Sequence, residues 1–268
     1  MKRIAFFVYG VSAYAFFLAT FLYTAGFLTN LGVPKSIDGP ARVDPQTAIA
    51  TNLILLTLFA LQHSGMARPG WKRVWTQIVP EPIERATYVL FSNLALIGVM
   101  VYWQPIEGTL WHFESGLPYA FGLIAFAFGV SIVLYSTLLI DHLDLFGLRQ
   151  VFAALKKRPA PESTFVVPSL YQFVRHPLYV GWFITLWATP SMTMSHLLFA
   201  LVGSLYMVIA VRYEERDLVD AFGRAYERYQ DTTPMLIPSL SAATAHAQSR
   251  TEASRGRAPH EVTRTLSL

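Results

Sequence analysis

A long segment without charged side chains constrains the fold of this chain more than any other feature. No Asp, Glu, Lys or Arg occurs between Arg175 and Arg212, and most residues there are apolar. A single helix of this length would be too long for a bilayer, because about 20 residues already span it. The Thr189-Pro190-Ser191 sequence near the middle is typical of a turn. We therefore expect a helical hairpin that enters the membrane, turns, and brings both charged ends to the same face.

The composition indicates an integral membrane protein. Of the 268 residues, 53% are hydrophobic and only 14% are charged, whereas about 25% of residues are charged in soluble domains. Before the hairpin, four further apolar segments are long enough to span a bilayer. The sequence thus predicts an all-α, polytopic membrane protein with four transmembrane helices plus a C-terminal transmembrane hairpin. The four segments are residues 4–29, 46–65, 86–103 and 117–140.

The chain divides into a membrane domain and a polar tail. Residues 1–238 hold all of the apolar segments, whereas residues 239–268 are rich in Ala, Ser, Thr and Arg and contain few large apolar residues. This composition is typical of disorder, so we expect a disordered cytoplasmic tail. The chain has no cysteine, which excludes disulfides and thiolate metal sites.

The basic residues are distributed unevenly over the predicted loops. Of the 21 Lys and Arg residues, 19 precede the first segment, lie in the second or fourth loop, or follow residue 211. Basic loops favour the cytoplasmic side of a membrane, so we predict an inner-membrane protein with both termini, these loops and the active site in the cytoplasm. The pattern suits a lipid bilayer as partner and argues against nucleic-acid binding.

Two charged clusters flank the hairpin, and each has two interpretations. Arg175-His176-Pro177 is a helix start with an interfacial arginine, since proline is favoured in the first turn. Alternatively, free backbone N–H groups there bind a carboxylate or the polar edge of a cofactor. The cluster from Arg212 to Asp217 is either a solvated helix with its own ion pairs or part of a site.

Histidines and acids also border the second and fourth segments. A histidine at the edge of a bilayer is uncommon and indicates function, so His63 is a candidate, with a capping or water-bridged histidine as the alternative. Asp141, His142 and Asp144 contain metal-ligand types. Because Asp141 and His142 are adjacent, they do not face each other on a helix, and we predict no metal.

The combined motifs resemble a known superfamily of membrane methyltransferases. Arg175-His176-Pro177-Leu178-Tyr179-Val180-Gly181 is followed by Arg212, Glu214-Glu215, Phe222-Gly223, Tyr226, Tyr229 and Pro234. This order resembles the isoprenylcysteine carboxyl methyltransferase and phospholipid methyltransferase superfamily. Leu61-Gln62-His63-Ser64-Gly65 and Asp144-Leu145-Phe146-Gly147-Leu148-Arg149-Gln150 are similar to bacterial methanethiol S-methyltransferases, which are relatives of NnrU-type membrane proteins.

The resemblance implies a cofactor site and a reacting site. It implies that S-adenosylmethionine is the cofactor and that a small thiol, methanethiol, is the substrate. It implies that Arg212 and Glu215 border the reacting groups. Relatives often have a glycine two residues before the position of Tyr171, where this chain has Ser169. The cofactor positions implied by the resemblance are Gln150, Phe165, Val166, Tyr171, His176, Pro177, Leu178, Tyr179 and Glu214.

Methyl transfer from a sulfonium is an in-line displacement that needs no metal. The protein must bind the cofactor, align the nucleophile and exclude water. Because a thiolate is the better nucleophile, a nearby base helps, and the candidates in order of preference are His63, His142 and Glu215. A lipid or isoprenylcysteine methyltransferase is the first alternative. A non-catalytic NnrU-like membrane protein is the second, and a reductase that uses a nicotinamide cofactor is a distant third.

Overall fold

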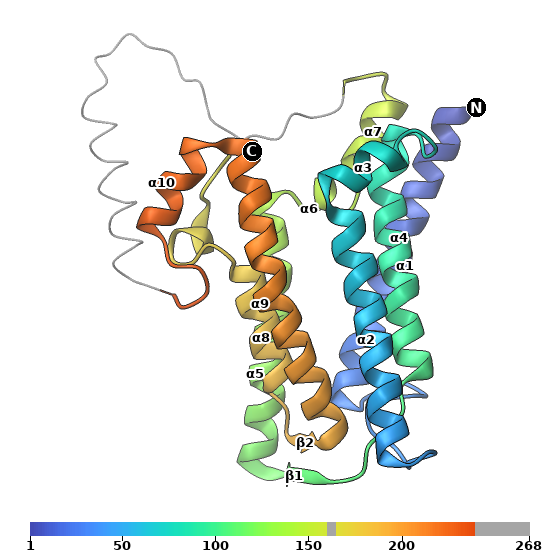
Figure 1. The fold of residues 1–268 in the computed structure, drawn as a ribbon, viewed down its shortest axis with the longest axis vertical. Coiled ribbons are helices and arrows are strands. Elements are labelled where there is room, and N and C mark those ends of the chain that lie inside the picture. The colour runs from blue at the N-terminus through green and yellow to red at the C-terminus, as the bar shows by residue number, and fades with distance from the viewer. Residues whose placement is uncertain (160–164, 239–268) are drawn as a thin grey trace.

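The computed structural model describes residues 1–159 and 165–238, and helices make up most of it (Figure 1). In these residues, five helices are long and apolar enough to cross a membrane, namely α1 (Lys2–Thr29), α2 (Pro45–Ala67), α4 (Glu81–Tyr102), α5 (Gly116–Ile140) and α9 (Met194–Phe222). The four segments predicted before the hairpin and the multi-pass fold are thereby confirmed. The predicted disordered tail, residues 239–268, lies outside the described residues.

Shorter elements connect and flank these helices. They are α3 (Pro69–Trp75), β1 (Thr109–His112), α6 (His142–Leu145), α7 (Leu148–Leu155), the 3-10 helix η1 (Ser169–Gln172), α8 (Pro177–Trp187), β2 (Ser191–Thr193) and α10 (Arg224–Thr232).

Local sequence signals set several helix ends. The side chain of Asp44 accepts a hydrogen bond from the backbone N–H of Thr47 at 3.0 Å, and Pro45 occupies the first position of α2. Thr193 caps α9 in the same way, through the N–H of His196. These caps satisfy backbone donors that have no partner within the helix. The first arm of the hairpin, α8, ends at Trp187, just before the predicted Thr-Pro-Ser turn.

The two arms of the predicted hairpin are α8 and α9. α8 has only 11 residues and is therefore about 16 Å long, too short to cross a bilayer alone. It packs closely against α5, where a Cβ on Gly129 would lie 2.6 Å from Oγ1 of Thr185. A Cβ on Gly181 would lie 2.8 Å from the backbone nitrogen of Val133. Glycine at both positions thus lets the two backbones approach.

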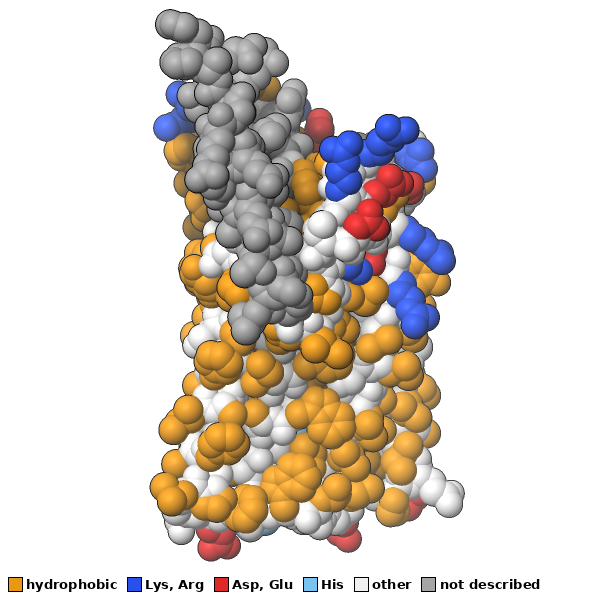
Figure 2. All heavy atoms as spheres, turned by 90° about the vertical axis from the view of Figure 1, so that its left-hand side faces the viewer, with side chains coloured by type: hydrophobic (Ala, Val, Ile, Leu, Met, Phe, Trp, Pro, Cys, Tyr) orange, Lys and Arg blue, Asp and Glu red, His pale blue; other side chains and the backbone are white. Residues whose placement is uncertain are grey.

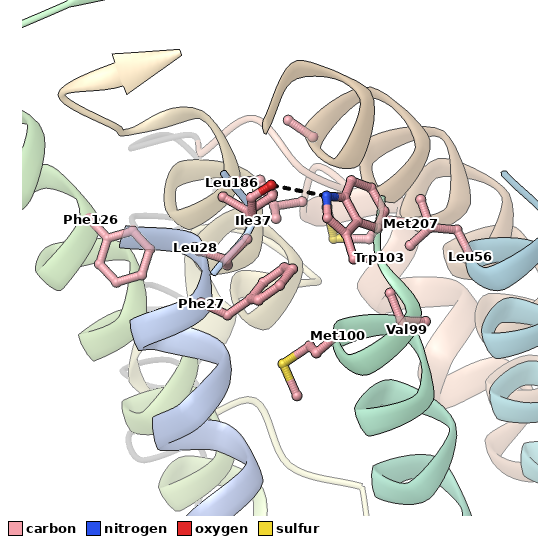
Figure 3. Close-up of a cluster of buried hydrophobic side chains, with 11 residues drawn as sticks. Phe27, Leu28, Ile37, Leu56, Val99, Met100, Trp103, Phe126, Leu186 and Met207 are labelled. Carbon is pink, nitrogen blue, oxygen red and sulfur yellow. Dashed lines mark hydrogen bonds between the residues drawn. The ribbon is translucent and has the colours of Figure 1, made fainter. Parts of the chain in front are cut away.

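The helices form two groups that join at one end of the molecule (Figure 1). α5, α8, α9 and α10 form one group, and α1, α2, α3, α4 and α7 form the other. Where they meet, Phe27, Trp103 and Leu186 belong to one buried apolar cluster (Figure 3). The indole nitrogen of Trp103 donates to the carbonyl of Ile37 at 3.1 Å, which satisfies the one polar atom of that side chain.

A short antiparallel ladder lies at the same end as this cluster. β1 pairs with β2, with Thr109 opposite Thr193 and His112 opposite Ser191. The ladder ties the α4–α5 connection to the turn of the hairpin (Figure 1). The all-α prediction did not include it, and it is a local exception in an otherwise helical chain.

The outer surface matches a chain that crosses a membrane several times. Figure 2 shows a broad band of apolar side chains, with Lys and Arg gathered at one end. Exposed apolar side chains on the membrane-spanning helices include Leu22 of α1 at 70% and Phe121 of α5 at 74%. α3, α6, α7 and α10 all lie at the end opposite the strands (Figure 1). The predicted basic loops therefore share one end of the molecule.

Candidate active site

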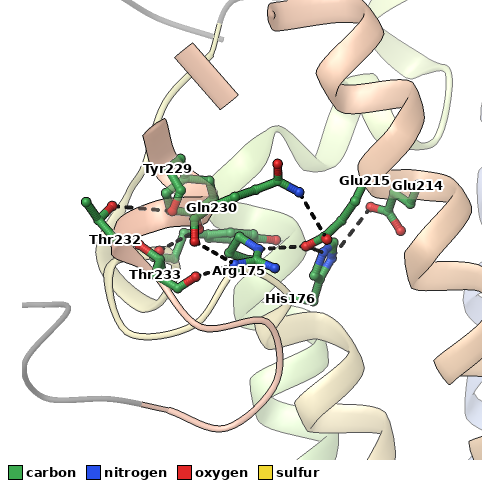
Figure 4. A network of polar contacts seen from close by, with 9 residues as sticks. Arg175, His176, Glu214, Glu215, Tyr229, Gln230, Thr232 and Thr233 are labelled. Carbon is green, nitrogen blue, oxygen red and sulfur yellow. Dashed lines mark hydrogen bonds and ion pairs between the residues drawn. The ribbon is translucent and has the colours of Figure 1, made fainter. Parts of the chain in front are cut away.

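A buried ion pair joins the start of α8 to the end of α9 (Figure 4). Nε of Arg175 lies 2.6 Å from Oε1 of Glu215, and their side chains are 9% and 10% exposed. Nε2 of His176 lies 3.1 Å from the same oxygen. Gln230 of α10 donates to the second oxygen, Oε2, at 3.2 Å. The hairpin therefore brings its two charged ends together, as the sequence predicted.

Arg175 also fixes the segment that follows α10. One of its terminal nitrogens donates to the carbonyl oxygens of Gln230, at 3.1 Å, and of Thr233. Its backbone N–H donates to Pro234 at 2.8 Å, and the next N–H donates to Met235 at 3.2 Å. These contacts hold the end of the described chain against the start of α8. An arginine with so many hydrogen bonds to the protein itself has a structural role.

The neighbouring acid, Glu214, is placed differently. Its Oε2 accepts a hydrogen bond from the hydroxyl of Tyr179 at 2.7 Å, and its Oε1 lies 4.0 Å from Nδ1 of His176. The side chain is 44% exposed, so it keeps room for a ligand. Glu214 also interacts electrostatically with the hydroxyl groups of Tyr171 and Tyr206. A carboxylate among tyrosine rings favours a cationic ligand.

The predicted segment before the hairpin lies beside this cluster. The ring of Phe165 contacts those of Phe222, Tyr226 and Tyr229, with centroids 5.6, 5.7 and 5.4 Å away. The hydroxyl of Tyr229 donates to the carbonyl of Tyr171 at 2.6 Å. Burial, together with the nearby Glu214 carboxylate, raises the pKa of Tyr171, so its hydroxyl stays protonated at neutral pH.

The first turn of α8 completes this part of the site. Pro177 occupies the first helical position and is buried, Leu178 is half-buried, and Val166 is half-buried in the preceding segment. No side chain caps this end of α8. The early backbone N–H groups of a helix have no intrahelical acceptor and can receive a polar or anionic group.

His63 lies in the membrane-spanning part of α2. Its Nδ1 is 3.1 Å from the hydroxyl of Ser92, and the hydroxyl of Tyr88 is 3.2 Å from each ring nitrogen. Its ring stacks on Phe59, with centroids 5.4 Å apart. The ring of Tyr206 on α9 is 6.5 Å away, which connects this cluster to the helix that carries Glu214.

The structure does not bring His142 into this group of residues. Thr137 donates its hydroxyl to the carbonyl of Leu134 and therefore accepts from Nδ1 of His142, 2.8 Å away. That assignment makes Nε2 the acceptor of the Tyr14 hydroxyl, also at 2.8 Å. Burial lowers the pKa of His142, against the opposing effect of Asp141. Both ring nitrogens are thus occupied, and His142 would have to give up a bond to act as a base.

Arg212 lies on the outer side of the ion-pair cluster. Its exposed side chain lines a groove of about 360 Å³ together with Glu215 and Gln230 of that cluster, and with Arg216 and Asp220. At 100° per residue, Arg212 and Glu214 point to nearly opposite sides of α9. Arg212 thus shares a groove with Glu215 but points away from Glu214, and its catalytic role stays a prediction. The same holds for Glu215, because its two oxygens already bind three side chains.

Gln150 lies on α7, beside the second group of helices. Its amide nitrogen donates to the carboxylate of Asp144 at 3.1 Å, whereas its Oε1 is buried without a hydrogen-bond partner. A buried carbonyl oxygen without a donor is costly, so a ligand that donates there would be favoured. Within the described residues, no three His, Cys, Asp or Glu side chains are arranged to hold a metal ion.

Sequence reasoning missed the residues that connect the two parts of the site. Tyr206 and Ser64, whose hydroxyls are 3.0 Å apart, link α9 to α2. Ser92 supports His63 from α4. Helical spacing offered one signal, because Tyr206 and Glu214 are eight residues apart and so share a face of α9. No comparable signal paired α2 with α9.

Comparisons with known proteins give a consistent result. Residues 131–220 match the isoprenylcysteine carboxyl methyltransferase (ICMT) family. A methanethiol S-methyltransferase of Crocosphaera subtropica is 47% identical over 233 residues, covering 87% of this chain and 91% of that protein. Its counterpart in a Pseudomonas species is 47% identical over 238 residues, covering 88% and 91%. The one from Mycobacterium tuberculosis is 41% identical, covering 89% and 98%. No solved structure matches the chain.

Proposed function

The chain belongs to the family of methanethiol S-methyltransferases, and we propose that it transfers the methyl group of S-adenosylmethionine to methanethiol. The products are dimethyl sulfide and S-adenosylhomocysteine. The observation that carries the proposal is the half-exposed Glu214 carboxylate, set among tyrosines and beside the free first turn of α8. This arrangement provides one surface for a cation and another for a polar or anionic group.

The residues present fit S-adenosylmethionine. Glu214 and the rings of Tyr171 and Tyr179 suit its positive groups, since cations are attracted to carboxylates and to aromatic faces. The first turn of α8 and the unpaired Oε1 of Gln150 suit its polar edges. When bound, this cofactor supplies the methyl group on a sulfonium.

His176 and Tyr179 would position this side of the site. His176 is held by Glu215 through one ring nitrogen, which directs the other toward Glu214. Tyr179 holds the Glu214 carboxylate through a 2.7 Å hydrogen bond. Phe165, Val166, Pro177 and Leu178 would form apolar walls that exclude water. Preorganised groups of this kind accelerate a displacement by fixing the approach of the reacting atoms.

The proton of the thiol must leave during the reaction. A thiol near the cysteine reference pKa of about 8.5 is mostly protonated at neutral pH. Of the three bases suggested by the sequence, His63 has the most support. Its ring lies 6.5 Å from that of Tyr206 on α9, the helix that carries Glu214, whereas Glu215 is paired with Arg175 and His142 bonds Tyr14 and Thr137 away from this group. A large fall in kcat for His63→Gln, with the kcat of His142→Gln kept, would support this assignment.

The orientation in the membrane is part of the proposal. The excess of Lys and Arg at the end that carries α3, α7 and α10 supports a cytoplasmic location for that end in the inner membrane. α7, which carries Gln150, lies at this end, and so do the last turns of α9, which carries Glu214 (Figure 1). The active site would then face the cytoplasm, where S-adenosylmethionine is made.

Headspace gas chromatography tests the function directly. Purified protein in detergent would receive S-adenosylmethionine and methanethiol, and wild type is expected to release dimethyl sulfide. Glu214→Gln should release much less, whereas Tyr213→Phe is the matched control because its ring is 52% exposed on the outside of α9. Cofactor binding without dimethyl sulfide would favour a lipid acceptor. Neither binding nor product would favour a non-catalytic membrane protein.

A further inference from the structure

A polar cluster lies within the apolar part of the bundle, apart from the Glu214 carboxylate. His63 on α2 contacts Tyr88 and Ser92 on α4 through hydrogen bonds of 3.1 to 3.2 Å. Polar and ionisable groups are costly inside a membrane and, when present, tend to line a site or pathway. The helices themselves do not require these groups, because α2 and α4 also pack through apolar residues.

The hydrogen bonds within this cluster are incomplete. The Tyr88 hydroxyl is 3.2 Å from both nitrogens of His63, so it is not directed at either one. The amide oxygen Oε1 of Gln62, the preceding residue, is buried and has no hydrogen-bond partner. The amide nitrogen of the same side chain is 3.5 Å from the hydroxyl of Ser92, so the Gln62 amide belongs to this cluster, and a donor to Oε1 would satisfy it. A small ligand with one donor would complete the cluster.

The cluster faces the Glu214 site across the two groups of helices. Tyr206 of α9 bonds Ser64 of α2 at 3.0 Å and lies on the same face of α9 as Glu214. The ring of Tyr206 also lies 6.5 Å from that of His63 and 6.4 Å from that of Phe59. The carboxylate that would hold a cationic cofactor is therefore close to the polar cluster on α2 and α4.

We propose that His63 and Tyr88 bind the sulfur atom of the acceptor thiol. This inference rests on the proposed function and specifies where the second substrate lies. The S–H group would donate to the cluster, where Gln62 offers a free oxygen. Polarisable sulfur is also favoured next to aromatic rings, and His63 is flanked by Phe59 and Tyr206. Methyl transfer would then run from the Glu214 side toward the α2–α4 side: the thiol sulfur forms its new bond to the methyl carbon as the bond from that carbon to the cofactor sulfur breaks, and the thiol proton passes to His63.

The substrate class follows from the size and chemistry of these groups. Serine, tyrosine and histidine side chains surround a donor, and the guanidinium of Arg85 lies 5.6 Å from the centre of the Tyr88 ring. Two charged groups act electrostatically on His63, and both are arginines, Arg68 and Arg85. They lie toward the end of the molecule that carries α3. Arg68 is paired with Asp217, and Arg85 donates to the carbonyl of Leu145. The site suits a neutral, small thiol.

Steady-state kinetics of His63→Gln and Tyr88→Phe test the inference. Both variants should raise the KM for methanethiol by about tenfold or more, as expected when a hydrogen-bonding partner of the substrate is removed. The Kd for S-adenosylmethionine, measured by calorimetry, should not change. Two matched controls remove similar groups elsewhere. Tyr9→Phe deletes a hydroxyl bonded to Thr87. His196→Gln replaces a buried histidine in the first turn of α9, at the end of the molecule that carries the strands.

The outcomes separate this inference from the proposed function. If wild type releases no dimethyl sulfide, the proposed function fails and the thiol site fails with it. If wild type is active and the KM for methanethiol is unchanged in both variants, the thiol site alone is overturned. A parallel loss of cofactor affinity would also overturn it, because that result indicates a general structural role. Ser92→Ala provides a third, milder variant if either of the first two fails to fold.

Discussion

Nε of Arg175 lies 2.6 Å from Oε1 of Glu215, and this contact fastens the first residues of α8 to the last turns of α9. Both side chains are about nine-tenths buried. His176 and Gln230 complete the bonds of the carboxylate. Two adjacent acids on one helix therefore differ in their surroundings. Glu215 holds the structure together, and Glu214 keeps free capacity for a ligand.

Removing the carboxylate of Glu215 should strongly destabilise the protein. Breaking a buried ion pair leaves an uncompensated charge, so Glu215→Ala is expected to lower the free energy of unfolding by about 3–5 kcal/mol. Thermal unfolding in detergent, followed by circular dichroism, measures this. Glu227→Ala is the control, since that residue lies exposed on α10, and it should change the melting temperature little. Equal melting temperatures for the two variants would contradict the structural role.

The hydroxyl of Tyr179 should contribute to cofactor affinity. Tyr179→Phe removes the 2.7 Å hydrogen bond that holds the Glu214 carboxylate. Since a hydrogen bond to a charged group contributes about 1.5–3 kcal/mol, the Kd for S-adenosylmethionine should rise by about tenfold or more. Calorimetry measures this, with Tyr213→Phe as the control. An unchanged Kd would mean that the carboxylate does not contact the cofactor.

Close packing between α5 and α8 should tolerate no larger side chain at Gly129. In Gly129→Leu the Cβ alone would meet Thr185 at 2.6 Å. Overpacking of this kind costs about 1–3 kcal/mol, and displacement of α8 should also weaken cofactor binding. Gly98→Leu is the matched control, because a Cβ there meets nothing within 4 Å. Similar melting temperatures for both variants would contradict the described packing.

His142 should make stability depend on pH. Its pKa in the folded state is lowered by burial, so the unfolded chain binds a proton more readily as the pH falls below about 6.5. The folded protein should therefore lose stability between about pH 7 and pH 5.5, and His142→Gln should lose less. Melting temperatures of both proteins over this range measure the difference, because contributions from the other histidines occur in both. Parallel curves would contradict the prediction.

The hairpin could be predicted from the sequence because the length of the segment, its lack of charge and its proline turn all limit how it can cross a membrane. A single helix through the 36 residues from 176 to 211, none of them Asp, Glu, Lys or Arg, does not fit a bilayer, and the Thr-Pro-Ser sequence offered a position for the turn. The cofactor segment was predicted by resemblance, and the structure brings His176, Tyr179, Tyr171 and Glu214 together. The relation of these residues to substrate stays a prediction.

Other features depend on contacts that a sequence pattern does not encode. The direction of Arg212 follows from the rotational phase of α9, and a shift of two residues moves a side chain to the opposite face. The β1–β2 ladder has three or four residues per strand, too few for an alternating pattern. The support of His63 by Ser92 requires the register between α2 and α4. Such details emerge only when the helices are packed.

The position of the apolar cluster and the strand ladder at one end has a consequence for local stability. Phe27, Trp103 and Leu186 are almost completely buried there, whereas the opposite end combines polar and ionic contacts with a smaller aromatic group around Phe165. Local opening costs least where few apolar contacts are lost. Amide hydrogens near the ladder should therefore exchange slowly, and those of α3, α7 and α10 quickly. The protein keeps its least stable turns at the end where its ligands would enter.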